Sequence, residues 1–131
     1  MFLRHSTDDG YVPSLEYRPA GAITPKIGLA LVESSGNLVL ATGTTKPTYI
    51  CMTERESALT AGDIIPVYRI DPSIIFETTF SASAADIKLG QKVTLASDGA
   101  RVTATTTSGV AEVVYIDGTA SGSMCRVRFP G

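Results

Sequence analysis

The sequence has few of the residues on which enzyme active sites depend. Its single histidine, His5, lies in a polar N-terminal stretch where no regular structure is expected to orient its ring. The two cysteines, Cys51 and Cys125, lack the CxxC spacing of zinc and redox sites, so we interpret them as small buried hydrophobic residues. No cluster of His, Cys or carboxylates has metal-ligand spacing. We therefore predict that the protein is not an enzyme and has no cofactor or metal.

Long apolar runs and an excess of charge are also missing. No segment approaches the roughly 20 apolar residues that a membrane-spanning helix needs. Residues 8–10 (DDG) interrupt the region where a secretory signal requires a continuous apolar run. The net charge of −2 at pH 7 excludes the broad positive field of a general nucleic-acid binder. We expect a protein that is made in the cytoplasm and has no membrane partner.

Apolar residues, in contrast, are abundant for a chain with so little charge. Hydrophobic residues make up 44% of the 131 residues, whereas charged residues make up 18%. A chain of this length builds one domain with a substantial core. The apolar excess predicts that part of the surface is shared with a partner.

The first 25 residues differ from the rest of the chain. They contain Pro13, Pro19 and Pro25, and they have no apolar periodicity of either the helical or the strand type. The sequence therefore predicts an extended N-terminal arm over residues 1–25. A solvated tail does not need apolar side chains. We accordingly predict that the arm contacts a partner or a neighbouring subunit through Phe2, Leu3, Tyr11, Val12, Leu15, Tyr17 and Arg18.

From Lys26 onward, short runs of β-branched residues alternate with turn residues, and the chain contains 16 threonines. The alternation in 125–129 (CRVRF) places two arginines on one face and three apolar groups on the other. Helix is limited to single turns near 53–61 and 82–87, and Asp98-Gly99 is typical of a type I′ hairpin. The fold class is therefore all-β, with strands expected near 27–33, 37–42, 48–54, 63–70, 74–81, 91–97, 101–106, 110–117 and 123–129.

An internal repeat runs through the predicted β region. Residues 26–28 (KIG) recur as 88–90 (KLG), and the turn and strand at 34–42 recur at 97–105. Each copy continues through a threonine-rich bend, an apolar strand and a glycine turn. We predict two pseudo-repeated four-strand units, at about 26–68 and 88–129, that pack together as a small β-barrel or sandwich within one domain, residues 26–131.

Small β-barrels also bind single-stranded nucleic acid, and this function is the main alternative. Such proteins stack bases on aromatic side chains beside basic residues. Here the basic residues are interleaved with acidic ones, so we do not expect a nucleic-acid partner. The residues that this alternative would use are Tyr49, Tyr68, Phe76 and Tyr115, with Arg69, Lys92, Arg101, Arg126 and Arg128.

Several segments together resemble one known family. They are 28–31 (GLAL), 61–67 (AGDIIPV), 89–99 (LGQKVTLASDG) and the closing segments 109–114 and 125–129. Over residues 26–129 the chain resembles the head decoration proteins, or capsid cement proteins, of tailed bacteriophages that have a small β-barrel. Because a fold serves several uses, a tail, baseplate or host-surface binding module stays open.

The resemblance implies a structural virion protein without chemistry of its own. Such a protein is made in the host cytoplasm, binds the major capsid protein on the outer surface of the head and stabilises the shell. It forms a homo-oligomer, commonly a trimer. If residues 1–25 are an arm that crosses onto a neighbouring subunit, deletion of residues 2–20 should leave a folded barrel that no longer binds its shell.

Overall fold

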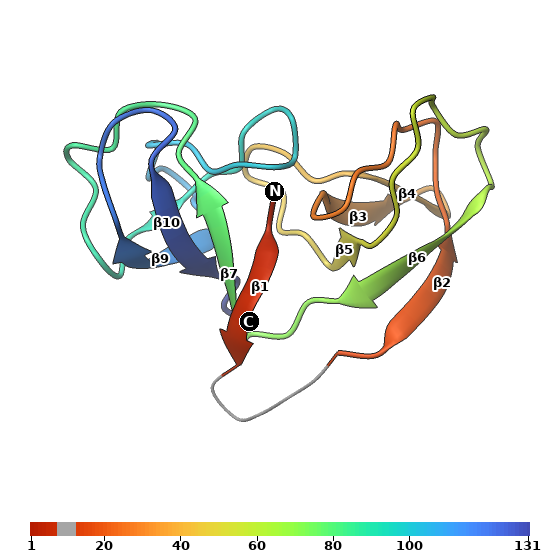
Figure 1. Ribbon diagram of the computed structural model, residues 1–131, viewed down its shortest axis with the longest axis horizontal. Coiled ribbons are helices and arrows are strands. Elements are labelled where there is room, and N and C mark those ends of the chain that lie inside the picture. Colours follow the sequence, from red (N-terminus) through yellow and green to blue (C-terminus); the bar gives the residue numbers. More distant parts are fainter. Residues whose placement is uncertain (8–12) are drawn as a thin grey trace.

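The computed structural model describes residues 1–7 and 13–131, and in this part of the chain the protein is all-β. Ten strands form two antiparallel five-stranded sheets, which lie side by side in Figure 1. The all-β fold class is therefore confirmed. The described residues form no helix, and so none that could cross a membrane.

The order of strands differs between the two sheets. The first sheet has the order β1-β7-β10-β9-β8 and consists of β1 (Leu3–Thr7), β7 (Ile74–Thr79), β10 (Met124–Arg128), β9 (Ala111–Ile116) and β8 (Lys92–Val93). The second has the order β2-β6-β5-β3-β4 and consists of β2 (Leu15–Pro19), β6 (Ile64–Arg69), β5 (Tyr49–Cys51), β3 (Ala30–Ser34) and β4 (Asn37–Leu40). We call β2–β6 the N-terminal unit and β7–β10 the C-terminal unit.

Each unit closes on itself through an isolated bridge. Ala20, just after β2, forms a parallel bridge with Leu38 of β4. Phe80, just after β7, forms the same kind of bridge with Val102. Closure gives each unit a hydrophobic interior, which is the small-barrel solution to unpaired strand edges. The first interior contains Leu31, Leu38, Tyr49, Cys51, Ile65 and Val67; the second contains Phe76, Phe80, Val93, Val102, Val113, Cys125, Val127 and Phe129.

The two units repeat each other's hydrogen bonds in detail. In the pairing of β2 with β6, Pro19 lies opposite Ile64. In the pairing of β7 with β10, Thr79 lies opposite Met124, so each residue of this second pair comes 60 residues after its counterpart in the first. The N–H of Gly21 donates to Leu38 at 2.8 Å, as that of Ser81 does to Val102 at 2.8 Å. Each repeating unit thus has five strand positions, one more than the sequence predicted, because β2 and β7 open the two copies.

The predicted arm is part of the two sheets. β1 pairs with β7 in the C-terminal unit, and β2 pairs with β6 in the N-terminal unit. Figure 1 shows β1 between the two units. Phe2 is 1% exposed and packs edge-on against Phe129, with ring centroids 5.5 Å apart. This corrects the prediction of a separate arm. The two five-residue segments have no periodic signal in the sequence, because each forms a strand only by pairing with a distant strand. Deletion of residues 2–20 would remove two strands and a core side chain.

Other local predictions were also too long or of the wrong type. Regular strand pairing in the predicted 91–97 ends at Val93, and 101–106 contributes only the bridges of Val102. Neither predicted helical turn forms. The positive φ values of a type I′ turn occur at Ser35 and Gly36, at 51° and 85°. At the other hairpin, Gly99 alone has positive φ, since Asp98 instead accepts the N–H of Ala100 at 2.9 Å.

Candidate binding surface

The pairing of β2 with β6 separates their side chains onto two faces. Leu15, Tyr17 and Pro19 lie opposite Tyr68, Pro66 and Ile64, and the period of two places all six on the face that points away from the interior of the N-terminal unit. At Tyr68 this face is covered, because Tyr68 stacks with Phe76 of the C-terminal unit at 6.4 Å. Farther along, at β2 and the start of β6, nothing in the described residues covers it.

The uncovered part of this face is apolar. Leu15 is 53% exposed, Tyr17 68% and Ile64 55%. Of the eight large hydrophobic side chains exposed in the described part of the chain, three therefore lie together on two paired strands. Contiguous exposed apolar surface typically marks an interaction site, whereas single exposed residues do not. We call Leu15, Tyr17 and Ile64, with the half-buried Pro19 and Pro66, the β2–β6 apolar patch.

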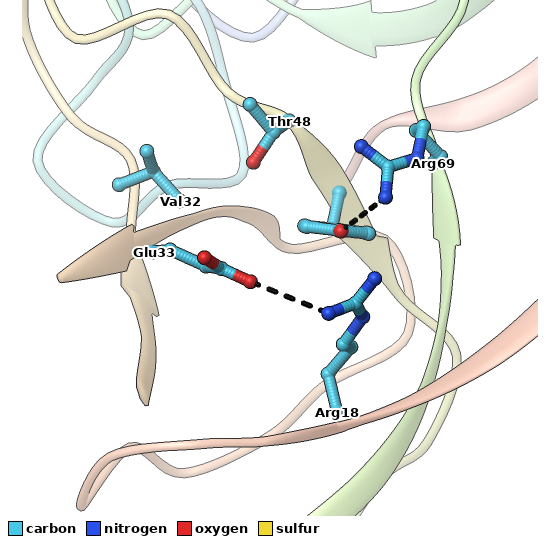
Figure 2. Close-up of a pocket in the computed structure, with 6 residues that line it drawn as sticks. Arg18, Val32, Glu33, Thr48 and Arg69 are labelled. Carbon is cyan, nitrogen blue, oxygen red and sulfur yellow. Dashed lines mark hydrogen bonds and ion pairs between the residues drawn. The ribbon is translucent and has the colours of Figure 1, made fainter. Parts of the chain in front are cut away.

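The opposite face of β2 carries charges over the mouth of the N-terminal unit. Arg18 and Arg69, labelled in Figure 2, both lie over the ring of Tyr49. The two guanidinium groups lie 5.4 Å and 4.9 Å from the ring centroid, and Arg69 donates to the Tyr49 hydroxyl at 2.7 Å. Together with Glu33 these residues line an open depression of about 460 Å³. Cation–π contacts of this kind fix the arginines over the ring.

Glutamates neutralise this arginine pair. Glu16 contacts Arg18 at 2.9 Å and Arg69 at 3.4 Å, and Glu33 lies 3.7 Å from Arg18. The hydrogen bond from Arg18 is the main reason that the pKa of Glu16 is lowered, and the same bond raises the pKa of Arg18. With two positive and two negative groups, the depression has no net field for an anion. We interpret the cluster as the polar closure of the mouth, which holds β2 against β5 and β6.

The structure separates the predicted partner-contact residues. Leu15 and Tyr17 are brought together on the patch, whereas Arg18 belongs to the charged cluster on the other face. Leu3 is 48% exposed on β1. Phe2 is buried in the protein's own core, which corrects the prediction that its side chain contacts a partner. Tyr11 and Val12 lie outside the described residues.

Sequence reasoning missed the other half of the patch. Ile64 and Pro66 join Leu15 and Tyr17 because of the β2–β6 pairing, which links segments about 50 residues apart. A signal was present in 64–68 (IIPVY), where the buried Ile65 and Val67 alternate with outward positions. The sequence therefore indicated which positions of 64–68 point outward, but it did not indicate that this strand pairs with residues 15–19.

The aromatic residues of the nucleic-acid alternative do not form a stacking surface. Tyr49 is 3% exposed, Tyr68 6% and Phe76 0%, so none of the three rings can stack on a base. Burial raises the pKa of Tyr68 to about 12. Tyr115 is more exposed, but Arg126 lies over its ring at 4.5 Å. Among the residues that the structure describes, no group of three or more His, Cys, Asp or Glu is placed to hold a metal ion.

The sequence matches no protein-family model and no curated protein. Among solved structures, the fold is similar to that of the N base of the head fibre gp8.5 of bacteriophage phi29. The similarity has a TM-score of 0.55 at 16% sequence identity, and it covers 90% of this chain and 94% of the phage chain. At this identity the similarity shows a shared fold, which includes both units.

Proposed function

We propose that this chain is a structural protein of a bacteriophage particle, which binds the outside of the head and stabilises it. The observation that carries the proposal is the similarity to the base of a phage head fibre over nearly the full length of both chains. The resemblance of 89–99 and the other segments to head decoration proteins supports the same kind of particle. A virion surface protein needs a folded core and a contact surface, and the two closed units and the exposed β2–β6 apolar patch support such a role.

The contact with the shell is assigned in this proposal to the β2–β6 apolar patch. Its three exposed side chains would lose their contact with water on binding, and burial of apolar surface is worth about 25 cal/mol per Å². The partner is then the major capsid protein, which offers many identical sites, so that an oligomer of this chain binds with avidity. Tyr11 and Val12, which precede β2, remain predicted contributors to this contact.

The location is tested on purified particles of the virus that encodes the chain. We expect mass spectrometry to detect the protein in the particles and cryo-electron microscopy to place its density on the outer surface of the head. Density on the tail or baseplate would instead support the host-surface binding module. Absence of the protein from the particles would contradict a virion role altogether.

The contact surface is tested by adding purified protein to heads that lack it and measuring co-sedimentation. We expect Tyr17→Asp and Ile64→Asp to reduce bound protein at least tenfold, because each buries an unpaired charge in the contact. Leu89→Asp is the matched control, since Leu89 is 63% exposed but lies in the C-terminal unit, away from the patch. Equal binding by Tyr17→Asp and Leu89→Asp would show that another surface binds the shell.

A further inference from the structure

β2 is the end strand of its five-stranded sheet, and its outer edge is open among the described residues. β2 pairs with β6 on one side, and no described strand pairs with its other side between Leu15 and Tyr17. The edge closes only farther on, where the N–H of Gly21 donates to Leu38. Unpaired strand edges are ready templates for pairing with another strand.

The main-chain groups of two residues point to this open edge. The carbonyl of Pro66 accepts the N–H of Met52 at 3.0 Å, so the backbone of Pro66 faces β5 and not β2. Tyr17, opposite Pro66, is therefore in a non-hydrogen-bonded pair, and its N–H and C=O point away from β6. Leu15, two residues earlier, has the same orientation. Another strand can thus bond to Leu15 and Tyr17 without disturbing β6.

The molecule already contains the corresponding contact in its other unit. β7 occupies the same place as β2, and its outer edge is filled by β1, which pairs Leu3 with Glu77 and Arg4 with Phe76. Glu77 and Phe76 are the counterparts, 60 residues later, of Tyr17 and Glu16. The fold therefore accepts an antiparallel strand at this edge, and in the N-terminal unit that place is vacant among the described residues.

The charges on β2 indicate which strand fits. Glu16 and Arg18 lie 2.9 Å apart within one copy. An antiparallel copy of β2 centred on Tyr17 would in addition place Glu16 opposite Arg18 of the second copy, and Arg18 opposite its Glu16. Opposite charges facing each other across strands are stabilising, whereas like charges are destabilising. The pattern is complementary to itself, which is the requirement of a twofold contact. We propose that two copies of this chain associate through their β2 strands, in antiparallel register about Tyr17.

The contact is short and limits itself to two copies. Pro13 and Pro19 flank the pairing segment and have no N–H to continue it. Each copy uses its single β2 edge, so the contact closes at a dimer and not at the trimer that the resemblance implies. The two apolar patches then lie next to each other on one face, with the Tyr17 side chains adjacent at the centre. This inference does not depend on what the patch binds.

Disulfide cross-linking tests the register. In a hydrogen-bonded antiparallel pair, facing Cα atoms are about 5.5 Å apart, within the range of a disulfide. We expect Tyr17→Cys to form a covalent dimer under mild oxidation at least ten times faster than Leu15→Cys, whose two copies would lie roughly 13 Å apart along the strands. Leu3→Cys, on an exposed position of β1, gives the background rate. A Tyr17→Cys rate equal to that of Leu3→Cys would overturn the proposal.

Charge reversal tests the same contact by mass measurement. Analytical ultracentrifugation should find the unmodified chain as a dimer, and Glu16→Arg and Arg18→Glu, each alone, shifted to monomer. An equimolar mixture of the two variants should recover the dimer, because a mixed pair has opposite charges at both positions. Recovery cannot result from misfolded variants. An unmodified chain that is monomeric or trimeric, or a mixture that stays monomeric, would refute the β2 pairing.

Discussion

The two units of this protein have the same hydrogen-bond framework but different surfaces. At the edge of β7 the C-terminal unit is covered by β1, whereas the corresponding edge of β2 is open in the described structure. On the outward face, Glu77 lies beside Arg126 in the C-terminal unit. Their counterparts in the N-terminal unit are Tyr17 and Pro66. One framework thus supports a polar, completed surface and an apolar, incomplete one.

This difference separates the unit that is completed within the chain from the unit to which we assign binding. The N-terminal strand β1 completes the C-terminal unit, and Phe2 fills its core. The N-terminal unit keeps an edge and an apolar face that no residue of the described part of the chain covers. A repeated framework with one copy completed internally is therefore the reason that we propose the other copy as the interaction half.

The largest expected effect concerns the completed unit. Phe2→Ala removes a fully buried ring that packs on Phe129, and such truncations cost about 3–5 kcal/mol. Urea denaturation should show this loss in the free energy of unfolding. Leu3→Ala, on the exposed neighbouring position, should stay within about 0.5 kcal/mol. If Phe2→Ala were as mild as Leu3→Ala, β1 would not be the element that completes the C-terminal unit.

A second effect tests a position at which the two copies differ. Gly109 corresponds to Pro47, since the residues that follow them, Val110 and Thr48, make equivalent hydrogen bonds to Val93 and Leu31. A Cβ at Gly109 would clash with the carbonyl oxygen of Lys92, a backbone atom. We expect Gly109→Ala to cost about 1–3 kcal/mol in thermal unfolding, as other overpacked sites do. An unchanged Tm would show that the backbone of Lys92 does not restrict the space at residue 109.

The two cysteines report on whether the units unfold together. Cys51 lies in the interior of the N-terminal unit and Cys125 in that of the C-terminal unit, and both are free and buried. Burial raises the pKa of the Cys125 thiol to about 12 and also raises that of Cys51. We expect both to resist thiol reagents at pH 8 and to become reactive at the same urea concentration, because residues of both sheets share one core cluster.

Single Cys51→Ala and Cys125→Ala variants assign the reactions to each thiol. Exposure of one thiol at a lower urea concentration than the other would show that the units unfold separately and that the shared core does not couple them.

The smallest expected effect is a change in the thermal stability of the protein at acidic pH. The pKa of Glu16 is lowered, so its ion pairs stabilise the folded state fully above its ordinary value of 4.5, and this contribution is lost as the pH falls through the lower folded-state value. Glu16→Gln should therefore reduce the fall in Tm between pH 6 and 3. Glu56→Gln, at an exposed loop position, is the control. The same pH dependence in both variants would exclude Glu16 as a contributor.

Much of the fold could be predicted because its signals are local. The alternation in 125–129 predicted the buried Cys125, Val127 and Phe129 and the outward arginines, as observed. Turn residues and β-branched runs similarly predicted most strands. The N-terminal strands were not predicted, because residues 1–25 have no period of their own and form strands only against β7 and β6. The type of each hairpin also depended on side-chain bonds such as that of Asp98.

The candidate binding surface was likewise predictable from the sequence only in part. The sequence showed that Leu15 and Tyr17 are apolar residues in a polar, proline-rich context, from which we predicted that they contact a partner. It did not show that Phe2 finds this contact inside the protein, whereas Leu15 and Tyr17 do not. That outcome depends on which strand lies opposite each segment and on how far the neighbouring unit extends over it.

The sequence by itself determined the all-β class, the two related halves and the side-chain alternation, because strand period and turn chemistry act over a few residues. The tertiary structure alone decided that β1 completes one unit and that β2 leaves the other open. The physical reason is that segments distant in the chain decide whether a strand edge is paired and whether an apolar face is covered. The local sequence does not indicate which distant segments these are.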